Sequence, residues 1–305
     1  KRHSDEFIAS QRFLPYVPVD QQEVDTRFLL HFFLSDPGMA LIRKASPGTV
    51  TRNRTLGMKA FEELQIPLPS IADQRAIVKN LSRFEGIRSA VKRAGEDARR
   101  VMNGLRQRTI DAAAALGEPV RLGSVLELAR RPVQVEPQRE YLEIGVRSFG
   151  RGIFHKEPVS GASLGEKRVF RVAEGDLVVS NVFAWEGAVA MATASDAGRI
   201  GSHRFMTWIT TSEKVDPNYL CQYLTSDRGV AQLLRASPGS AGRNKTLAIQ
   251  AFQDLEIAIP DLGSQLTAVA RLNRLAEVRS LTESRWSIAE ASPQAARNEV
   301  FSKFV

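Results

Sequence analysis

The stretch ASPGTVTRNRTLGMKAFEELQIPLP occupies residues 45–69, and a closely similar stretch, ASPGSAGRNKTLAIQAFQDLEIAIP, occupies residues 236–260. The similarity continues upstream without a gap, so that residues 24–69 align with residues 215–260 at an offset of 191 positions. Twenty of these 46 aligned positions are identical. Such self-similarity indicates an internal duplication. The chain is therefore expected to contain two copies of one module.

The two copies differ in length. Looser similarity leads back to SQRF at residues 10–13 in the first copy and to SHRF at residues 202–205 in the second. Residues 119–201 of the second copy have no counterpart in the first, because the sequence begins at Lys1. Three explanations stay open: a fragment of a longer protein, a naturally short chain that pairs as a half, and a chain completed by another polypeptide.

A long helix is expected directly after the first copy. Ser70 followed by Asp73 is a capping-box arrangement, which is typical of a helix N-terminus. Nine apolar residues follow at intervals of three and four: Ile77, Leu81, Phe84, Ile87, Val91, Ala94, Ala98, Val101 and Leu105. This stripe predicts a helix from Ser70 to Leu116, on the order of 70 Å long.

A second long helix is expected after the second copy. Its apolar stripe is weaker and includes Val269, Leu272, Leu275 and Trp286. We expect this helix to be interrupted at Pro293, because proline removes a helical hydrogen bond. The simplest arrangement pairs the two helices as an antiparallel coiled coil. The alternative is that the long helix docks on a globular core.

Between the helices the pattern is mixed. Strands are predicted at residues 141–146, 168–172, 176–181, 187–192, 205–210 and 255–259, and short helices at 218–225 and 228–235. The predicted fold class is therefore α+β, with a mixed sheet, short helices and two long paired helices. The predicted domains are the C-terminal part of a first module (1–69), a spacer helix (70–117), a complete second module (118–261), and a second spacer helix with a tail (262–305).

Composition excludes several classes of protein. Hydrophobic residues make up 43% of the 305 residues and charged residues 25%, as in ordinary globular proteins. No apolar run approaches the ~18 residues of a membrane-spanning helix, so a cytoplasmic protein is predicted. The single cysteine, Cys221, excludes an intrachain disulfide and a cysteine-based zinc site, and the four histidines are scattered. No metal and no cofactor are expected on this chain.

The net charge of +8 favours an acidic partner, of which nucleic acid is the commonest. The excess is concentrated in residues 70–117, which hold ten basic and five acidic residues. Residues 118–261 hold 17 of each. If this region contacts DNA, it must therefore do so through a local patch of positive charge.

No catalytic constellation is found in the sequence. Asp216-Pro217-Asn218-Tyr219 faintly resembles an amino-methyltransferase motif, but its counterpart at residues 25–28 lacks the proline. No glycine-rich cofactor loop accompanies the motif. We expect a helix N-cap followed by a buried aromatic residue instead.

Three loops are rich in hydrogen-bond donors: residues 148–156, residues 180–187 and the duplicated tip Arg-Asn-Lys/Arg-Thr. Arginine and lysine bind phosphates or guanine, and asparagine can bind adenine with two hydrogen bonds. The predicted DNA-binding residues are Arg151, Lys156, Asn181, Arg204, Arg243, Asn244, Lys245, Arg52, Asn53 and Arg54. The alternatives are that Asn244 and Thr246 only cap a turn, and that Phe149, Phe154 and Trp185 belong to the core.

The motifs and their order resemble the specificity (S) subunits of type I restriction-modification systems. The resemblance rests on IPLPSIADQRAIV at residues 66–78, GDLVVS at 175–180, the Ser-Pro-Gly loops and the duplication itself. The second copy keeps IAIP at 257–260 and Gln265, but has Leu266 in place of the arginine. The missing start of the first module departs from the family pattern.

The resemblance implies a non-catalytic subunit that recognises double-stranded DNA. In this family each module reads one half of a bipartite site, and the paired helices fix the spacing between the halves. Two methyltransferase (M) subunits, which carry S-adenosylmethionine, bind the helices, and restriction (R) subunits join the complex. Two other hypotheses remain: a structural coiled-coil adaptor whose globular domains bind protein, and an enzyme.

Overall fold

The computed structural model describes residues 10, 13, 15–20, 22–46, 55–239 and 245–304. The chain forms two compact units. Unit 1 comprises residues 1–98 and 280–305, and unit 2 comprises residues 99–279. Among the described residues, no helix combines the length and the apolar character needed to cross a bilayer.

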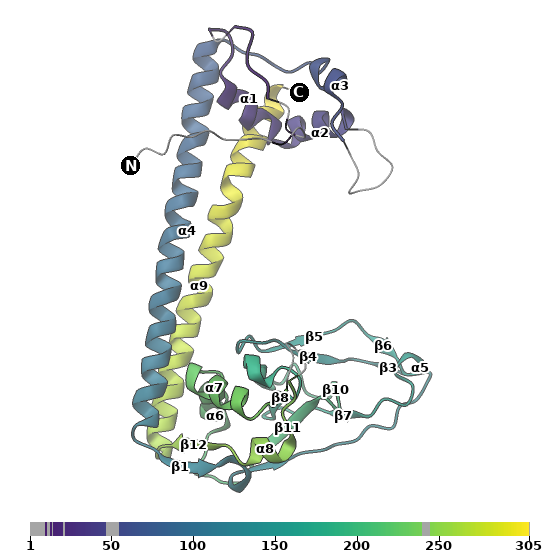
Figure 1. Ribbon diagram of the computed structural model, residues 1–305, viewed down its shortest axis with the longest axis vertical. Helices are drawn as coiled ribbons and strands as arrows, with labels where there is room; N and C mark the ends of the chain where they lie inside the picture. Colours follow the sequence, from purple (N-terminus) through teal and green to yellow (C-terminus); the bar gives the residue numbers. More distant parts are fainter. Residues whose placement is uncertain are drawn as a thin grey trace. The chain divides into compact units, whose positions relative to one another are not determined.

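Unit 2 contains a four-stranded antiparallel sheet of order β2-β11-β8-β9, of which the two inner strands β8 and β11 are labelled in Figure 1. Its strands are β2 (Leu126–Leu128), β8 (Leu177–Ser180), β9 (Val189–Met191) and β11 (Phe205–Thr210). Four antiparallel strand pairs accompany it: β1 (Glu118–Arg121) with β12 (Glu256–Ile259), β3 (Glu140–Tyr141) with β6 (Val159–Ser160), β4 (Ile144–Val146) with β5 (Ile153–His155), and β7 (Val169–Arg171) with β10 (Ile200–Ser202). All four residues of β8 are buried, as expected for an apolar central strand.

Helices cover one side of this sheet. They are α6 (Pro217–Leu224), α7 (Asp227–Arg235) and α8 (Ile249–Gln253), together with parts of the two long helices. The short helix α5 (Gly161–Leu164) lies beside β3 and β6 instead (Figure 1). In the core, the Trp208 ring of β11 packs on Phe252 of α8 with ring centroids 4.8 Å apart. Ile110 and Leu272, one from each long helix, are buried in the same cluster. The core of unit 2 therefore joins sheet, short helices and long helices.

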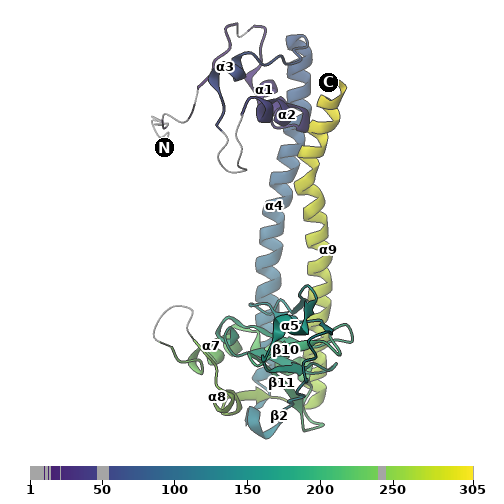
Figure 2. The same cartoon turned by 90° about the vertical axis from the view of Figure 1, so that its right-hand side faces the viewer.

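Unit 1 is helical in its described part. It contains α1 (Thr26–Phe33), α2 (Asp36–Lys44) and α3 (Met58–Glu62), which lie beside segments of the two long helices (Figures 1 and 2). Its core consists of Phe28, Phe32, Val78, Leu81 and Phe301. No strand forms among the described residues of this unit.

The two copies reproduce each other at the offset of 191. The bounds of α1, α2 and α3 correspond residue for residue to those of α6, α7 and α8. Gln74 is fully buried; its Oε1 accepts from the Asp25 amide at 2.9 Å, and its Nε2 donates to the carbonyls of Glu23 and Pro69. Gln265 makes the same contacts in unit 2, accepting from Asp216 and donating to the carbonyls of Lys214 and Pro260. The duplicated sequence therefore encodes a duplicated set of buried contacts.

The long helices are α4 (Ile71–Ala114) and α9 (Leu262–Phe301), and they too are repeat equivalents. Gln107 of α4 accepts from the Asp227 amide at the start of α7. Asn298 of α9, 191 positions later, accepts from the Asp36 amide at the start of α2. The duplication therefore extends through the long helices, beyond the segment that sequence identity reveals.

Within each unit the long helices lie side by side (Figures 1 and 2). In unit 1 they run antiparallel, since Glu85 pairs with Arg297 and Gly95 lies against Trp286. A Cβ at Gly95 would stand 2.2 Å from the Trp286 ring, so glycine permits the close approach. Phe84 and Ile87 of the predicted stripe are 41% and 56% exposed. Leu81 of the stripe is buried, but farther along the helix the buried positions are Gly95 and Met102, each one residue after a stripe position. The apolar stripe therefore coincides with the buried seam only in part.

The expected interruption at Pro293 is wrong. Helix α9 continues through this proline to Phe301. Pro293 has no amide hydrogen for the carbonyl of Ala289, and the Ser292 hydroxyl donates to that carbonyl at 2.9 Å instead. A neighbouring serine thus replaces the hydrogen bond that proline removes.

All six predicted strand segments contain strands. The segment 141–146 is divided between β3 and β4. Five strands were not predicted, each only two to four residues long: β1, β2, β5, β6 and β10. Alternation of apolar and polar residues carries little information over such short stretches.

Candidate nucleic-acid interface

Two of the donor-rich loops meet in unit 2. The loop at residues 147–152 joins β4 to β5, and residues 181–187 join β8 to β9. The Phe149 and Gly150 amides donate to the carbonyls of Glu186 and Gly187 at 2.7 and 3.0 Å, and the Ser148 hydroxyl donates to the Glu186 carboxylate at 2.7 Å. These three hydrogen bonds fix the two loops against each other.

The third loop reaches the same place. The Leu247 amide donates to the Asn181 carbonyl at 2.8 Å, and the Lys245 ammonium stands 5.2 Å from the centroid of the Trp185 ring. A cation at this distance over an indole is attracted to the ring. The turn between β10 and β11 joins the cluster as well, because the Asn181 amide donates to the Arg204 carbonyl at 2.8 Å. The loop at residues 181–187 therefore contacts both other loops and the turn: Glu186 and Gly187 bind the 147–152 loop, and the Asn181 backbone binds Leu247 and Arg204.

Phe149 has a conformation that is unusual for a bulky residue. Its φ is 64°, in the left-handed region that glycine normally occupies, and its side chain is 69% exposed. Arg151 lies against its ring, 5.5 Å from the centroid, and donates to the Ser148 carbonyl at 3.1 Å. The alternative that Phe149 is core is therefore wrong. A strained, exposed aromatic residue with a stacked guanidinium is more typical of a binding surface than of packing.

Asn181 connects the 181–187 loop to both the third loop and the Arg204 turn through its backbone. Its side-chain oxygen is buried and has no hydrogen-bond partner among the described residues. Buried polar atoms are nearly always paired, and leaving one unpaired costs about 1–3 kcal/mol. This favours a binding role for Asn181 over a packing role.

The structure thus brings four of the predicted residues into one cluster of segments: Arg151, Asn181, Arg204 and Lys245. Lys156 lies elsewhere. It follows β5 at the end of the hairpin away from the 147–152 loop, and its ammonium is 3.7 Å from the Glu143 carboxylate. Arg52, Asn53, Arg54, Arg243 and Asn244 lie outside the described residues.

Two further residues near the loop cluster were not predicted in this role, Arg147 and Trp185. Arg147 is exposed and stacks over Phe154, 5.1 Å from its ring centroid. It directly precedes the predicted loop at residues 148–156, so its position was the available signal. The Trp185 ring is only partly buried and forms the cation–π contact with the Lys245 ammonium. No sequence pattern marked that pairing, because the two residues are far apart in the chain.

The faint methyltransferase motif is structural. Asp216 is the N-cap of α6, and its carboxylate accepts from the Asn218 amide at 2.7 Å. Tyr219 is fully buried and donates to the Ala258 carbonyl at 3.1 Å. Burial raises the pKa of Tyr219 well above its usual range. The expectation of a helix cap followed by a buried aromatic residue is confirmed.

Comparison with known proteins gives a consistent result. The family model described as "Type I restriction modification DNA specificity domain" matches residues 3–95. No curated protein sequence matches the chain. Among solved structures, an HsdS subunit from Thermoanaerobacter tengcongensis matches at 18% identity and a TM-score of 0.50, covering 93% of this chain and 72% of that one.

Two further solved structures agree. The type I restriction-modification S subunit from M. genitalium matches at 12% identity and a TM-score of 0.50, covering 93% of this chain and 74% of its own. A chain from a structure on complex assembly and conformational transition of the type I R-M system matches at 17% identity and a TM-score of 0.58, with coverages of 90% and 70%. Residues 3–95 thus match the type I restriction-modification DNA specificity domain, and the chain as a whole has the fold of HsdS specificity subunits.

Proposed function

We propose that this chain is a non-catalytic, sequence-specific DNA-recognition subunit whose unit 2 reads one half of a bipartite site. The observation that carries the proposal is that three donor-rich loops meet in unit 2, with the loop that contains Asn181 bonded to the other two. Arg151, Arg204 and Lys245 supply positive charge on these segments, although residues 118–261 are neutral overall. Such a local patch suits groove recognition, in which a few side chains distinguish the bases.

The domain organisation that we propose follows from comparing the repeats. Phe252 and Ile257 are 0% and 1% exposed in unit 2, where strands and the Trp208 ring cover them. Their equivalents Phe61 and Ile66 are only partly buried in unit 1. Unit 1 therefore has the helical part of a recognition module with an apolar face that a sheet covers in unit 2. We assign residues 1–69 to the C-terminal part of a first module and residues 118–261 to a complete second one.

The partners follow from the same assignment. Two methyltransferase subunits carrying S-adenosylmethionine would bind the chain, and restriction subunits would join them. The long helices, of 44 and 40 residues, would fix the spacing between the two half-sites. Methylation and cleavage would then be performed by the partners at the site that this chain selects.

The two kinds of loop have different roles in this proposal. The tip at residues 243–246 is nearly repeated at residues 52–55, whereas the loops at 148–156 and 180–187 have no counterpart in the first copy. A feature common to two modules suits contacts with the DNA backbone, because the sugar-phosphate chain has the same chemistry at every base sequence. Loops unique to one module suit base recognition. Lys245 is therefore assigned to affinity, and Asn181 to sequence preference.

The test is methylome sequencing of cells that express the chain with its neighbouring methyltransferase. A bipartite motif with a fixed spacer is expected. Asn181→Ala should alter one half of the motif, Lys245→Ala should lower methylation uniformly, and Lys214→Gln, on an exposed lysine outside the loops, should change neither. Absence of any site-specific methylation, with no salt-dependent binding of duplex DNA, would instead support a protein-binding adaptor.

A further inference from the structure

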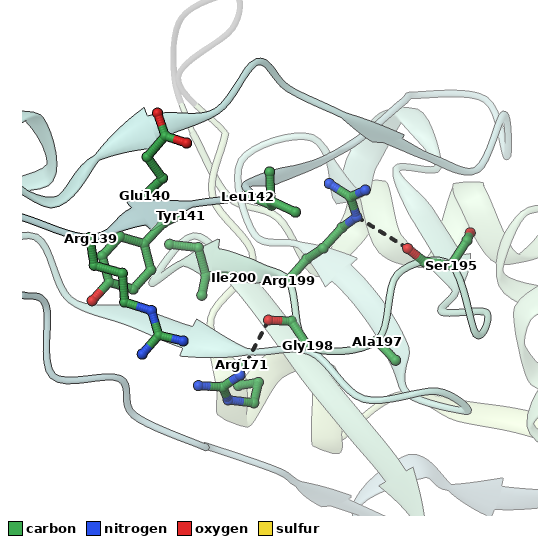
Figure 3. A pocket seen from close by; sticks show the side chains of 10 residues that line it. All are labelled: Arg139, Glu140, Tyr141, Leu142, Arg171, Ser195, Ala197, Gly198, Arg199 and Ile200. Carbon is green, nitrogen blue, oxygen red and sulfur yellow. Dashed lines mark hydrogen bonds between the residues drawn. The ribbon is translucent and has the colours of Figure 1, made fainter.

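A cavity of about 320 Å³ lies in unit 2, apart from the loop cluster (Figure 3). Leu142 and Ile200 line it. Strand β10 runs from Ile200 at the cavity to Ser202 beside the Arg204 turn, and β4 runs from just after Leu142 to the 147–152 loop. The cavity and the loop cluster therefore lie at opposite ends of the same two strands. Three strand residues separate them, about 10 Å.

Three arginines from separate segments line the cavity. Arg139 precedes β3, Arg171 ends β7, and Arg199 precedes β10. Arg171 donates to the Gly198 carbonyl at 3.4 Å, and the Nε of Arg199 donates to the Ser195 carbonyl at 3.1 Å. Each guanidinium has five N–H donors, so these contacts leave most of them available.

The positive charge in the cavity is poorly compensated. Within the described part of the chain, no carboxylate forms an ion pair with Arg171 or Arg199, and Glu136 lies 3.7 Å from Arg139. Glu140 is the one acidic lining residue, and its carboxylate points away from Arg139 and Arg171 (Figure 3). Like charges held near one another without a counter-charge repel, and an anion relieves that repulsion.

The turn that carries Arg199 is held in place before any ligand arrives. Asp196 is 5% exposed; it accepts from the Thr193 amide at 2.9 Å and from the Nε2 of His155 at 2.8 Å. The Arg199 amide donates to the Asp196 carbonyl at 3.2 Å. Asp196 is thus a positioning residue for Arg199, and the cavity is preorganised.

We infer that this cavity binds the sugar-phosphate backbone of DNA, at phosphates flanking the bases that the loop cluster reads. Arg139 and Arg171 extend toward one edge of the cavity and Arg199 toward another (Figure 3), which suits an extended polyanion better than one small anion. Phosphates of one strand recur every ~3.4 Å along the duplex axis. A site about 10 Å from the loops is therefore about three phosphates away. The inference rests on the proposed function and adds a second, sequence-independent contact to it.

The test compares salt dependence. In complex with its methyltransferase, the wild-type chain and the double variant Arg171→Gln/Arg199→Gln are titrated with target duplex between 50 and 200 mM salt. The slope of log K against log salt should fall in magnitude by about 0.9 for each phosphate that the double variant no longer neutralises. Target and non-target duplexes should weaken by the same factor. Arg171→Lys, which keeps a point charge, should retain most of the slope, and Lys214→Gln is the control.

Each other outcome has a defined meaning. An unchanged slope in the double variant, with site-specific methylation intact, would overturn the cavity assignment and leave the proposed function standing. A changed methylation motif would mean that the cavity reads bases. Calorimetric binding of inorganic phosphate that is abolished in the double variant, without a change in slope, would identify a free anion as the ligand. Absence of all salt-dependent DNA binding by the wild type would overturn the proposed function itself.

Discussion

Replacing Gln265 with leucine should strongly destabilise unit 2. The Gln265 side chain is fully buried at the start of α9, and it connects this helix to the segment that begins α6. Leucine has a similar volume but no polar atoms. The substitution therefore removes three hydrogen bonds and leaves the Asp216 amide and the Lys214 and Pro260 carbonyls without their partner.

The size of the effect follows from burial. The contacts to the Asp216 amide and the Pro260 carbonyl are buried, while the Lys214 carbonyl is nearer to solvent. Each buried backbone group left without a hydrogen-bond partner costs about 1–3 kcal/mol of stability. Part of this cost is offset, because the leucine variant no longer has to bury the polar amide of glutamine. We expect the free energy of unfolding to fall by about 2–4 kcal/mol. At about 2–4 °C per kcal/mol for a unit of this size, Tm should fall by roughly 4–16 °C.

The assay is urea unfolding followed by tryptophan fluorescence. A Trp286→Phe background leaves Trp185 and Trp208, both in unit 2, as reporters. Leu266→Ala is the matched control: this neighbouring side chain is 51% exposed, so its removal should change stability by less than about 0.5 kcal/mol. A decrease below about 1 kcal/mol for Gln265→Leu, or an equal decrease in the control, would refute the reasoning.

Two further predictions concern helix packing and pH. Gly95→Ala should lower the free energy of unfolding of unit 1 by about 1–3 kcal/mol, since its Cβ would collide with Trp286. Gly104→Ala, with no atom near its Cβ, should be neutral or stabilising by about 0.5–1 kcal/mol. Both variants are measured with Trp286 retained, by urea unfolding followed by circular dichroism. Burial alone would raise the pKa of Asp196, but hydrogen bonds, chiefly from Thr193, outweigh it and lower that pKa. The charged Asp196 carboxylate therefore stabilises the folded state fully above the unfolded-state pKa of about 4. This stabilisation is lost as the pH falls through the lower folded-state pKa. The difference in unfolding free energy between the wild type and Asp196→Asn should accordingly shrink below about pH 4, and a constant difference would contradict this.

Much of the fold could be predicted because the duplication and the apolar periodicity are strong signals. Residues 177–179, LVV, are a continuous apolar segment, and all four residues of β8 are buried. The prediction failed at Pro293, where propensity alone foretells a break. Ser292 repairs the missing hydrogen bond locally, and this depends on a side-chain rotamer that composition does not encode.

The candidate site could be predicted only loop by loop. Donor-rich composition marked the loops that carry Arg151, Asn181 and Lys245, but their convergence depends on sheet order and on long-range backbone hydrogen bonds. The arginine cavity was missed for a related reason. Arg171 and Arg199 lie 28 positions apart in the chain, in segments whose pairing as β7 and β10 was not predicted.

The contacts that recur in both copies involve residues that hold the module together, and none of these residues lies in the loop cluster or the cavity. Ser35 and Ser226 cap equivalent helices, and a Cβ on Gly38 or on Gly229 would lie within 2.0 or 2.2 Å of a carbonyl oxygen of the preceding helix. These identical residues fix how the two short helices of each copy pack. The hydrogen bonds of Gln265, and those of Gln74 in the first copy, fix the junction with the long helix. None of them belongs to the loop cluster or to the cavity. Under the proposed function, substitutions in the unduplicated loops should therefore change what is bound without disturbing the contacts that hold the module on its helices.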